Sequence, residues 1–139
     1  MKILAVDYGD ARTGLAMCDR TEFLASPIGQ ITEKSMAKVV EKIVYASREY
    51  EAGMIVIGLP KNMDGTEGAR AEKTRKMASL LTAIVDVPVE LWDERSTTVS
   101  AANILSDNGT FGKKRKQVLD AVAATVILES YLAYRKNQT

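Results

Sequence analysis

Two short apolar runs, at residues 3–6 and 54–57, most strongly limit the folds open to this chain. Each consists of four consecutive apolar residues, ILAV in the first run and MIVI in the second. A run of this length predicts a buried strand, and the second is typical of a strand covered on both faces in a parallel sheet. The 139 residues, which contain no internal repeat, are enough for one substantial core. We therefore expect a single domain over residues 1–139, built around a sheet.

The order of the other predicted elements indicates a mixed sheet. Further strands are expected over residues 15–18, 22–28 and 87–92, and helices from Thr32 to before Gly53 and over about 66–83, 97–107 and 118–134. Three antiparallel strands followed by alternating helices and strands predict an α/β fold. Its five-stranded mixed sheet has three antiparallel strands plus two parallel ones, with helices on both faces. Pro27 cannot donate to a sheet ladder, so the third strand is expected at an edge or to end early.

The composition is that of an ordinary soluble protein. Apolar residues make up 46% and charged residues 27%, and no apolar run approaches the roughly 20 residues that a membrane span requires. The single cysteine cannot form an internal disulfide, so a reducing, cytoplasmic location is expected. The net charge of +1 does not by itself indicate a nucleic-acid partner. Four consecutive cations at residues 113–116 are nevertheless expected in a basic loop over 110–117, where they contact phosphates or are simply solvated.

The chain contains no histidine, which removes several classes of chemistry. Catalysis by a Ser-His-Asp or Cys-His arrangement is excluded, as are histidine-ligated zinc and any imidazole general base. Any reaction must therefore use carboxylates, metal ions, lysines, hydroxyls or backbone groups.

Acidic residues occur where the predicted elements end. Asp7 closes the first apolar run, Asp93 and Glu94 follow the last strand, and Asp120 lies early in the last helix among small apolar residues. Ligands of such sheets bind at the carboxyl ends of the parallel strands, which also carry the loop at residues 58–65. Taken singly, Asp7 is equally well explained as a turn residue, and Asp120 is better explained as a favourable charge near a helix start. Three acids from separate elements, in a chain without histidine, favour a carboxylate metal site.

Four motifs together resemble one known family. They are VDYGDARTGLA at residues 6–16, VIGLPKNMDGTEG at 56–68, DERSTT at 93–98 and LDAVAATVILESYL at 119–132. In this order and spacing they are similar to the YqgF family, the Holliday-junction resolvase or pre-ribosomal-RNA nuclease group of the RNase H-like superfamily. The resemblance covers nearly the whole chain and implies an RNase H-like fold and a divalent-metal nuclease. It places Asp7, Glu94 and Asp120 in the positions of the family's acids.

The sequence departs from the commonest family pattern at two places. Asp10 stands where many members have a small hydroxyl residue, which adds negative charge near the expected phosphate path. The basic segment at 113–117 is KKRKQ, where a lysine-glycine-lysine sequence is frequent. Both departures concern substrate preference, because neither removes one of the three acids.

The implied reaction is hydrolysis of a phosphodiester bond with the help of Mg²⁺ or Mn²⁺, which prefer oxygen ligands. In a two-metal mechanism the ions activate water and stabilise the leaving oxygen, so no histidine is needed. Asp7 is expected as the central metal ligand and catalytic residue, with Glu94 and Asp120 completing the site. Asp93 is less suited, because adjacent residues at a strand end point apart.

Several polar residues are candidates for holding the substrate by its phosphates. They are Arg12, Lys61, Asn62, Thr66, Arg95, Thr97, Lys114 and Arg115. The competing explanation for each is loop solvation or helix capping, and Arg95 is also placed to pair with a neighbouring carboxylate. Tyr8 and Trp92 are candidates for stacking on bases, although a tryptophan in a strand is more often part of the core.

Three functions are open at this point. The first is a nuclease for the 5′ end of pre-16S rRNA in ribosome biogenesis, and the second is a Holliday-junction resolvase of recombination and repair. The third is a non-catalytic nucleic-acid-binding module, which would depend on Lys114 and Arg115 but not on Asp7 or Glu94. An actin-like ATPase also has an early Asp-x-Gly hairpin, but it needs a second copy of the domain that this chain lacks. The expected partner is structured RNA, pre-rRNA or branched DNA, with no membrane, and the protein is expected to be a monomer or a homodimer.

Overall fold

The computed structural model describes residues 1–96 and 112–138, and the side chains of these residues except those of residue 96 and residues 112–120. In chain order the elements are β1 (Ile3–Asp7), β2 (Arg12–Cys18), β3 (Ala25–Thr32), α1 (Met36–Glu49), β4 (Met54–Leu59), α2 (Ala69–Thr82), β5 (Val89–Asp93), the short 3₁₀ helix η1 (Glu94–Ser96) and α4 (Gly112–Lys136). The helix predicted over about 97–107 lies outside the described residues. None of the helices in the described part is long and apolar enough to cross a membrane.

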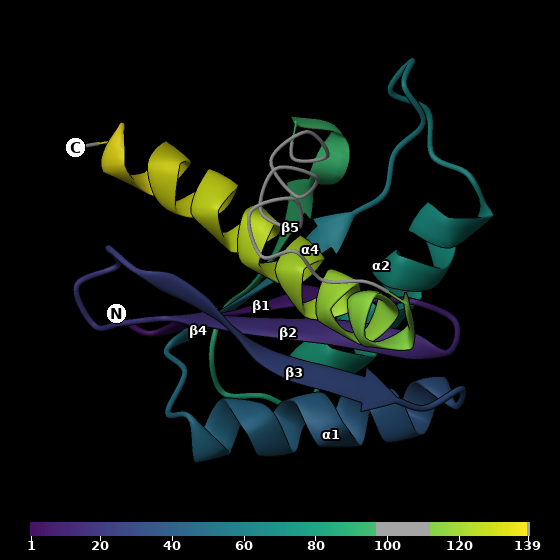
Figure 1. The fold of residues 1–139 in the computed structure, drawn as a ribbon, viewed down its shortest axis with the longest axis horizontal. Coiled ribbons are helices and arrows are strands. Elements are labelled where there is room, and N and C mark those ends of the chain that lie inside the picture. The colour runs from purple at the N-terminus through teal and green to yellow at the C-terminus, as the bar shows by residue number, and fades with distance from the viewer. Residues whose placement is uncertain (97–111, 139) are drawn as a thin grey trace.

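The five strands form one mixed sheet in the order β3-β2-β1-β4-β5 (Figure 1). β1 pairs antiparallel with β2 and parallel with β4, β2 pairs antiparallel with β3, and β5 runs parallel to β4. The predicted combination of antiparallel and parallel strands is therefore confirmed. Both apolar runs that defined the prediction lie side by side in the middle of the sheet, where neighbouring strands satisfy their backbone groups.

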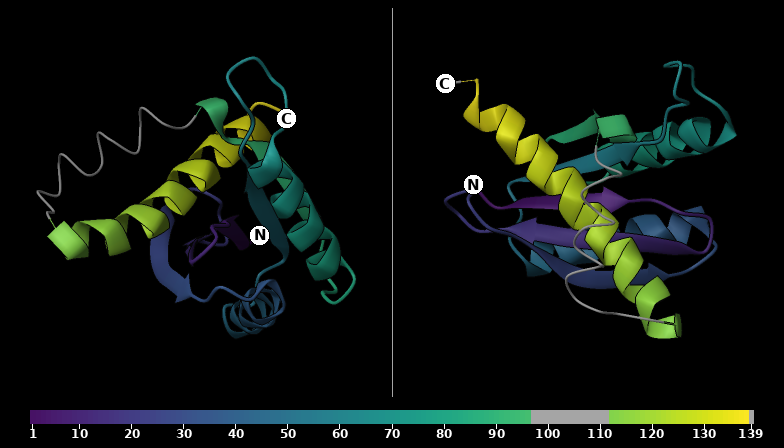
Figure 2. Two further views of the ribbon diagram at one scale, coloured as in Figure 1. Left: turned by 90° about the vertical axis from the view of Figure 1, so that its right-hand side faces the viewer. Right: turned by 45° about the horizontal axis from the view of Figure 1, so that its top comes forward.

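Helices cover both faces of the sheet, as predicted (Figure 2). Side chains alternate along β1, so that Leu4 and Val6 enter one core while Ile3 and Ala5 enter the other. The first core is closed by α1 and α2, and the second by α4. This alternation decides which residues at the strand ends face α4.

The edge strand β3 differs from its prediction at both ends. It begins at Ala25 rather than residue 22, because the side chain of Asp19 accepts hydrogen bonds from the backbone of Phe23 and Leu24 and closes the preceding turn. It continues to Thr32, where a helix was expected to start. The edge position expected from Pro27 is confirmed, whereas an early end is not.

Three helices begin at positions other than those predicted. α1 begins at Met36, because the Ser35 side chain accepts a hydrogen bond from the backbone N–H of Lys38 and caps that end. α2 begins only at Ala69, since the residues before it form a separate hydrogen-bonded loop. α4 begins already at Gly112, so residues 113–116 belong to a helix and the predicted basic loop over 110–117 is wrong for this part.

The hairpin between β2 and β3 is tied to the end of α4 by one carboxylate. Glu22 Oε1 accepts a hydrogen bond from Arg135 Nε at 2.6 Å, and its Oε2 accepts one from the amino terminus of Met1 at 2.9 Å. The Arg135 hydrogen bond, followed by that of the amino terminus, lowers the pKa of Glu22 from 4.5 to about 2. Because the pKa is lower in the folded chain, ionised Glu22 stabilises the fold above pH 4.5, and this contribution is lost as the pH falls toward 2.

We expect Glu22→Gln to lower the free energy of unfolding at pH 6 by about 2 kcal/mol, a value reduced from the full pKa shift because the pair is partly exposed. The difference between wild type and variant should shrink as the pH approaches 2, since protonated wild-type Glu22 has lost the same charge. Urea unfolding between pH 6 and pH 2.5 measures both quantities. Glu51→Gln is the control, because its ion pair with Arg20 at 4.0 Å is fully on the surface. A difference that stays constant with pH would contradict the assignment.

Candidate active site

Asp7 lies at the carboxyl end of β1, in the middle of the sheet. It is half-buried and pairs with Gly14 of β2 across the antiparallel ladder. Because Ile3 and Ala5 face α4, the alternation of the strand places position 7 on the same face. The first predicted acid therefore lies at the strand end and on the helix-covered face that the sequence argument requires.

Glu94 reaches the same face from the far side of β4. It follows β5 in η1, and its side chain lies directly against the backbone of Gly58 in β4. A Cβ atom on residue 58 would lie 2.8 Å from Glu94 Cγ and 2.5 Å from Ile127 Cδ1 of α4, in addition to striking the Glu94 carboxylate. Only glycine leaves room for this carboxylate between β4 and α4.

The register of the sheet relates these two acids. Val6 of β1 is level with Ile57 of β4, so the next positions, Asp7 and Gly58, are neighbours at the ends of two parallel strands. Since Glu94 lies on Gly58, the structure brings Asp7 and Glu94 to the same end and the same face of the sheet.

Asp120, the third predicted acid, lies in the first half of α4. Its side chain is outside the described residues, so its relation to the other two acids stays a prediction. Ile127, which touches the Gly58 site, follows it by seven residues, a spacing that places two positions on one face of a helix. Within the part of the chain that the structure describes, no three acidic or cysteine side chains form a group that could hold a metal ion.

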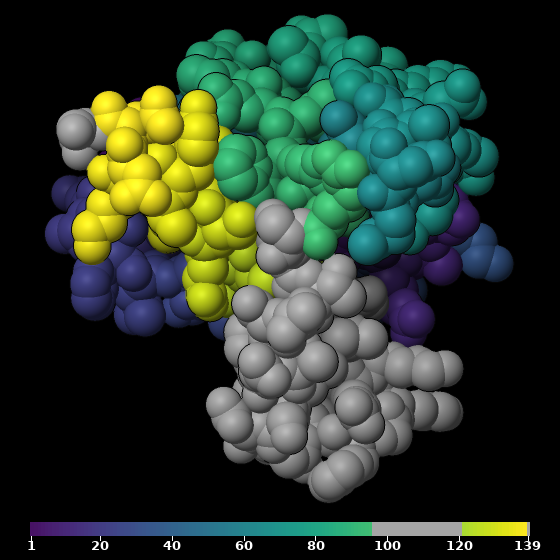
Figure 3. Space-filling view, turned by 90° about the horizontal axis from the view of Figure 1, so that it is seen from above, coloured from purple at the N-terminus to yellow at the C-terminus, as the bar shows by residue number. Residues whose placement is uncertain are grey.

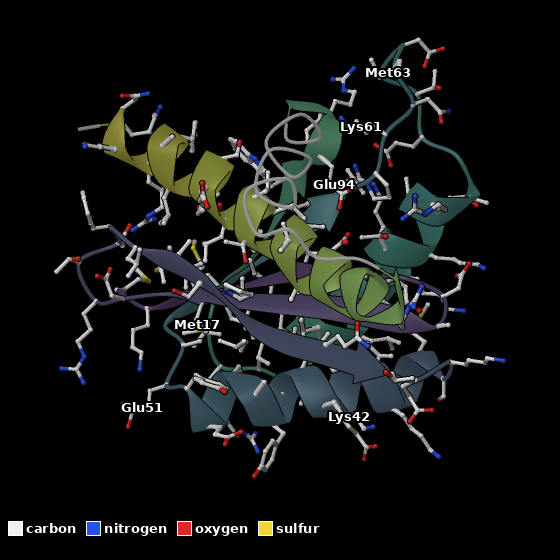
Figure 4. The ribbon with its side chains drawn as sticks, viewed as in Figure 1. Met17, Lys42, Glu51, Lys61, Met63 and Glu94 are labelled. Atoms are coloured by element: carbon white, nitrogen blue, oxygen red, sulfur yellow. The ribbon has the colours of Figure 1, made fainter. Side chains whose placement is uncertain are left out.

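The β4–α2 loop brings three predicted substrate residues to this end of the molecule. Asn62 and Thr66 are joined through their side chains at 2.9 Å, and the Asn62 backbone N–H donates to the Thr66 carbonyl at 2.8 Å. Asp64 Oδ1 accepts hydrogen bonds from both the backbone and the hydroxyl of Thr66, which lowers the pKa of Asp64. Lys61 lies lower on the loop, with Glu94 nearby at the same end of the sheet (Figure 4). Thr66 is thus part of a loop, and the predicted helix start at that residue is wrong.

Arg95 is bound to the carboxylate of Asp93. Its Nη2 and Nε donate to Asp93 Oδ2 at 2.7 and 2.9 Å, and its backbone N–H donates to Oδ1 at 3.0 Å. These hydrogen bonds lower the pKa of Asp93 and raise that of Arg95. The guanidinium also donates to the Met63 carbonyl at 3.5 Å, which links η1 to the β4–α2 loop. The pairing of Arg95 with a neighbouring carboxylate, one of its two sequence interpretations, is confirmed.

The remaining candidates are spread more widely. Arg12 begins β2, two residues before Gly14, which pairs with Asp7. Its side chain is exposed at the same end of the sheet as Asp7. Tyr8 is buried in the core that α1 and α2 close, so its suggested stacking on bases is wrong. Lys114 and Arg115 lie in α4, but their side chains are outside the described residues, and Thr97 is outside them altogether.

The exposed Asp10 forms an ion pair with Lys73 at 3.2 Å, which offsets the extra negative charge noted in the sequence.

A sizeable hollow lies at the opposite end of the sheet from these acids. It has a volume of about 650 Å³ and lies between the β2–β3 hairpin and the end of α4. Its polar groups pair with one another, Glu22 with Arg135 and Glu90 with the Tyr131 hydroxyl. Because these groups satisfy one another, we take the acids at the strand ends as the better guide to a candidate site.

Two residues of this region were missed by sequence reasoning. Gly58 was taken only as part of a loop, although it is the one glycine of β4, is buried and lies under Glu94. Met63 was not considered, yet its side chain is 88% exposed at the tip of the β4–α2 loop. A glycine that closes an apolar strand and a methionine between polar loop residues were the available signals.

The chain matches one family model over most of its length. The model is described as "RuvX: Holliday junction resolvase" and matches residues 1–134. A protein of Halothermothrix orenii named "Putative pre-16S rRNA nuclease" is 43% identical over 135 residues, covering 97% of this chain and 96% of the relative. A protein of the same name from Thermoanaerobacter pseudethanolicus is 40% identical over 139 residues, covering 99% and 100%.

Two solved structures share this fold and are distantly similar in sequence. RuvC of T. thermophilus in complex with a Holliday junction substrate has a TM-score of 0.64 and 14% identity, over 99% of this chain and 96% of that one. The Fowlpox virus resolvase in complex with Holliday junction DNA has a TM-score of 0.61 and 11% identity, over 96% and 98%. At this identity the likeness concerns the fold, and it confirms the RNase H-like architecture expected from the four motifs.

Proposed function

This chain belongs to the RuvX family of nucleases, and from that premise we propose that it hydrolyses phosphodiester bonds of pre-16S rRNA in the cytoplasm. The observation that carries the proposal is the position of Glu94, whose carboxylate lies on Gly58 at the end of β4, beside the end of β1 that bears Asp7. Two carboxylates that the fold brings to one face at neighbouring strand ends are the kind of group with which proteins hold a divalent cation.

The donor atoms of this site fit a hard divalent cation. Asp7 and Glu94 offer carboxylate oxygens, which Mg²⁺ and Mn²⁺ prefer, and in this histidine-free chain no imidazole competes for the role. We propose that these two residues hold the ion, with Asp120 of α4 as the third ligand. When bound, a divalent ion supplies activation of the attacking water and stabilisation of the leaving oxygen.

The chain's own residues would bind and orient the substrate. Lys61 and Asn62 follow β4 and Arg12 begins β2, so all three lie at the same end of the sheet as the two acids and suit phosphates near the scissile bond. The Thr66 hydroxyl is held by Asp64 and Asn62, so it is presented in a fixed position. Arg95 is neutralised by Asp93 and is better placed to order η1, and with it Glu94, than to bind a phosphate.

Two other functions are kept as alternatives. Resolution of Holliday junctions is supported by the description of the family model, and it requires two active sites that act on one junction. A non-catalytic nucleic-acid-binding role would use the cations of α4 and leave the acids without a task. The first proposal is favoured by the names of the two relatives, which this chain matches over 96% and 100% of their own length.

The test compares substrates and metals directly. With Mg²⁺ or Mn²⁺ we expect the protein to cut an RNA that carries the 5′ precursor segment of 16S rRNA, and we expect EDTA to abolish cleavage because the carboxylates hold the ion. An equimolar four-way DNA junction is the matched competitor. Faster cleavage of the junction would replace the first proposal by the second, and binding of both without cleavage in any divalent metal would support the non-catalytic role.

A further inference from the structure

A second hollow lies beside the candidate active site. It has a volume of about 390 Å³ and is lined by Met63, Trp92, Asp93 and Arg95. The residue that follows Asp93 is Glu94, so the hollow adjoins the proposed reacting centre along the chain. In the view from above, β5 and η1 lie between α4 on one side and the β4–α2 loop with α2 on the other (Figure 3). A substrate bound at Glu94 would therefore pass over this hollow.

The charges in the hollow are matched within it. Arg95 directs Nε and Nη2 to the Asp93 carboxylate and Nη1 to the Met63 carbonyl. The positive charge of the guanidinium is therefore already neutralised by Asp93, and a phosphate bound here would be repelled by the Asp93 carboxylate. An uncharged group with hydrogen-bonding edges fits this combination better than an anion does.

One residue that lines the hollow, Met63, has an apolar side chain that is exposed to solvent. Met63 is 88% exposed, and the loop around it is closed by the backbone bond from Gly65 to Asn62 and by the bonds between Asn62 and Thr66. Gly65 has a φ of +90°, which allows the sharp turn after Met63. An exposed apolar residue held on an ordered loop is the feature with which nucleic-acid-binding proteins separate stacked bases.

The hollow is also lined by an aromatic residue, Trp92, whose ring is held in place by α4. Trp92 donates from Nε1 to Ser130 Oγ at 3.1 Å, and its ring packs against Tyr131 and Tyr134 at centroid distances of 5.3 and 5.1 Å. The ring remains only half-buried and lines the hollow. An aromatic surface ordered before binding loses little conformational freedom when a base stacks on it.

We propose that this hollow binds one unpaired nucleobase of the substrate, next to the scissile phosphate, between Met63 and Trp92. The inference rests on the proposed nuclease function and adds a structural preference to it, namely for strands whose bases are unpaired or easily unstacked. Stacking accepts any base, while the Asp93–Arg95 pair presents both a carboxylate and N–H groups to the base edge. Lys61, whose charge also acts on Asp93, suits the phosphate that adjoins this base.

Trp92 is the only tryptophan of the chain, so its fluorescence reports on the hollow directly. The intact protein is titrated in EDTA with an eight-nucleotide single-stranded RNA, and in parallel with the same backbone in which abasic sugars replace the bases. We expect the RNA to quench Trp92 emission and the abasic strand of equal charge to leave it unchanged. Met63→Ser should weaken binding of the RNA roughly tenfold and binding of the abasic strand not at all.

Leu80→Ala is the matched control, because Leu80 is an exposed apolar residue on the distant helix α2. Met63→Leu keeps an apolar side chain at this position and should bind the RNA as wild type does. This variant therefore distinguishes loss of the apolar contact from a change in the folding of the β4–α2 loop. Binding of RNA without a change in Trp92 emission, or equal weakening of both strands by Met63→Ser, would overturn the subsite and leave the proposed function standing. No binding of either strand at low salt would instead overturn the proposed function, and the subsite with it.

Discussion

Replacing Asp7 by asparagine is expected to lower the rate of phosphodiester cleavage by about 10³-fold while the protein still folds and binds nucleic acid. Asparagine has nearly the same shape, so the half-buried position at the end of β1 keeps its packing. The substitution removes one full negative charge from the proposed metal site, where an ion contributes several kcal/mol to the transition state. Single-turnover cleavage of the 5′ precursor RNA in saturating Mg²⁺ measures the rate.

Asp10→Asn is the matched control for this experiment. Asp10 lies three residues further along the same hairpin and carries the same charge, but it is exposed and paired with Lys73. Its loss should change binding slightly and the cleavage rate by less than threefold, because its charge is screened by solvent. Cleavage by the Asp7 variant at the wild-type rate would remove Asp7 from the mechanism and suggest that a contaminating nuclease is responsible.

The centre of this fold could be predicted from the sequence because its signals are local and redundant. The run at residues 3–6 is apolar on both faces, and the structure shows why: alternate residues of β1 enter two different cores. Val39, Val40 and Ile43 recur at helical spacing in the sequence, and all three are buried on one face of α1. Such patterns indicate which residues of an element are buried, and the buried faces determine how helices and sheet stack in an α/β domain.

Element ends were less predictable, because they depend on single hydrogen bonds. The Asp19 turn displaced the start of β3, and the Ser35 cap displaced the start of α1. Both residues favour turns and caps in several registers, so the sequence alone leaves the choice open. The segment of four cations was taken for a loop because of its charge, although lysine and arginine have high helix propensity, and it lies in α4.

The candidate site was predictable residue by residue but not as an arrangement. Each acid could be assigned to a strand end or a helix from its own neighbours in the sequence. That Glu94 lies on Gly58 depends on the parallel register of β4 and β5, in which Leu59 is level with Asp93. The pairing of Arg95 with Asp93 depends on the turn that η1 makes after β5. Long-range register of this kind leaves no periodic signal in a single sequence.

Adding a single methyl group at residue 58 is expected to lower the cleavage rate by about 10²-fold. In Gly58→Ala the new Cβ would overlap the Glu94 side chain and lie 2.5 Å from Ile127 Cδ1, so Glu94 must leave its position. A displacement of about 1 Å at a catalytic group is enough for a loss of this size. The overlap should also lower the free energy of unfolding by about 1–3 kcal/mol, as overpacking in a core does. Cleavage rates and urea unfolding are measured on the same preparation.

Two further variants separate the displacement of Glu94 from general loss of stability. Gly68→Ala adds the same methyl group where its nearest neighbour, Asn62 Nδ2, is 3.8 Å away, so both the rate and the stability should stay close to wild type. Adding Ile127→Val to Gly58→Ala removes the contact with α4 but not the overlap with Glu94, so stability should recover while the rate stays low. Recovery of the rate together with the stability would show that Gly58 serves packing alone, because then the Glu94 carboxylate tolerates the methyl group beneath it.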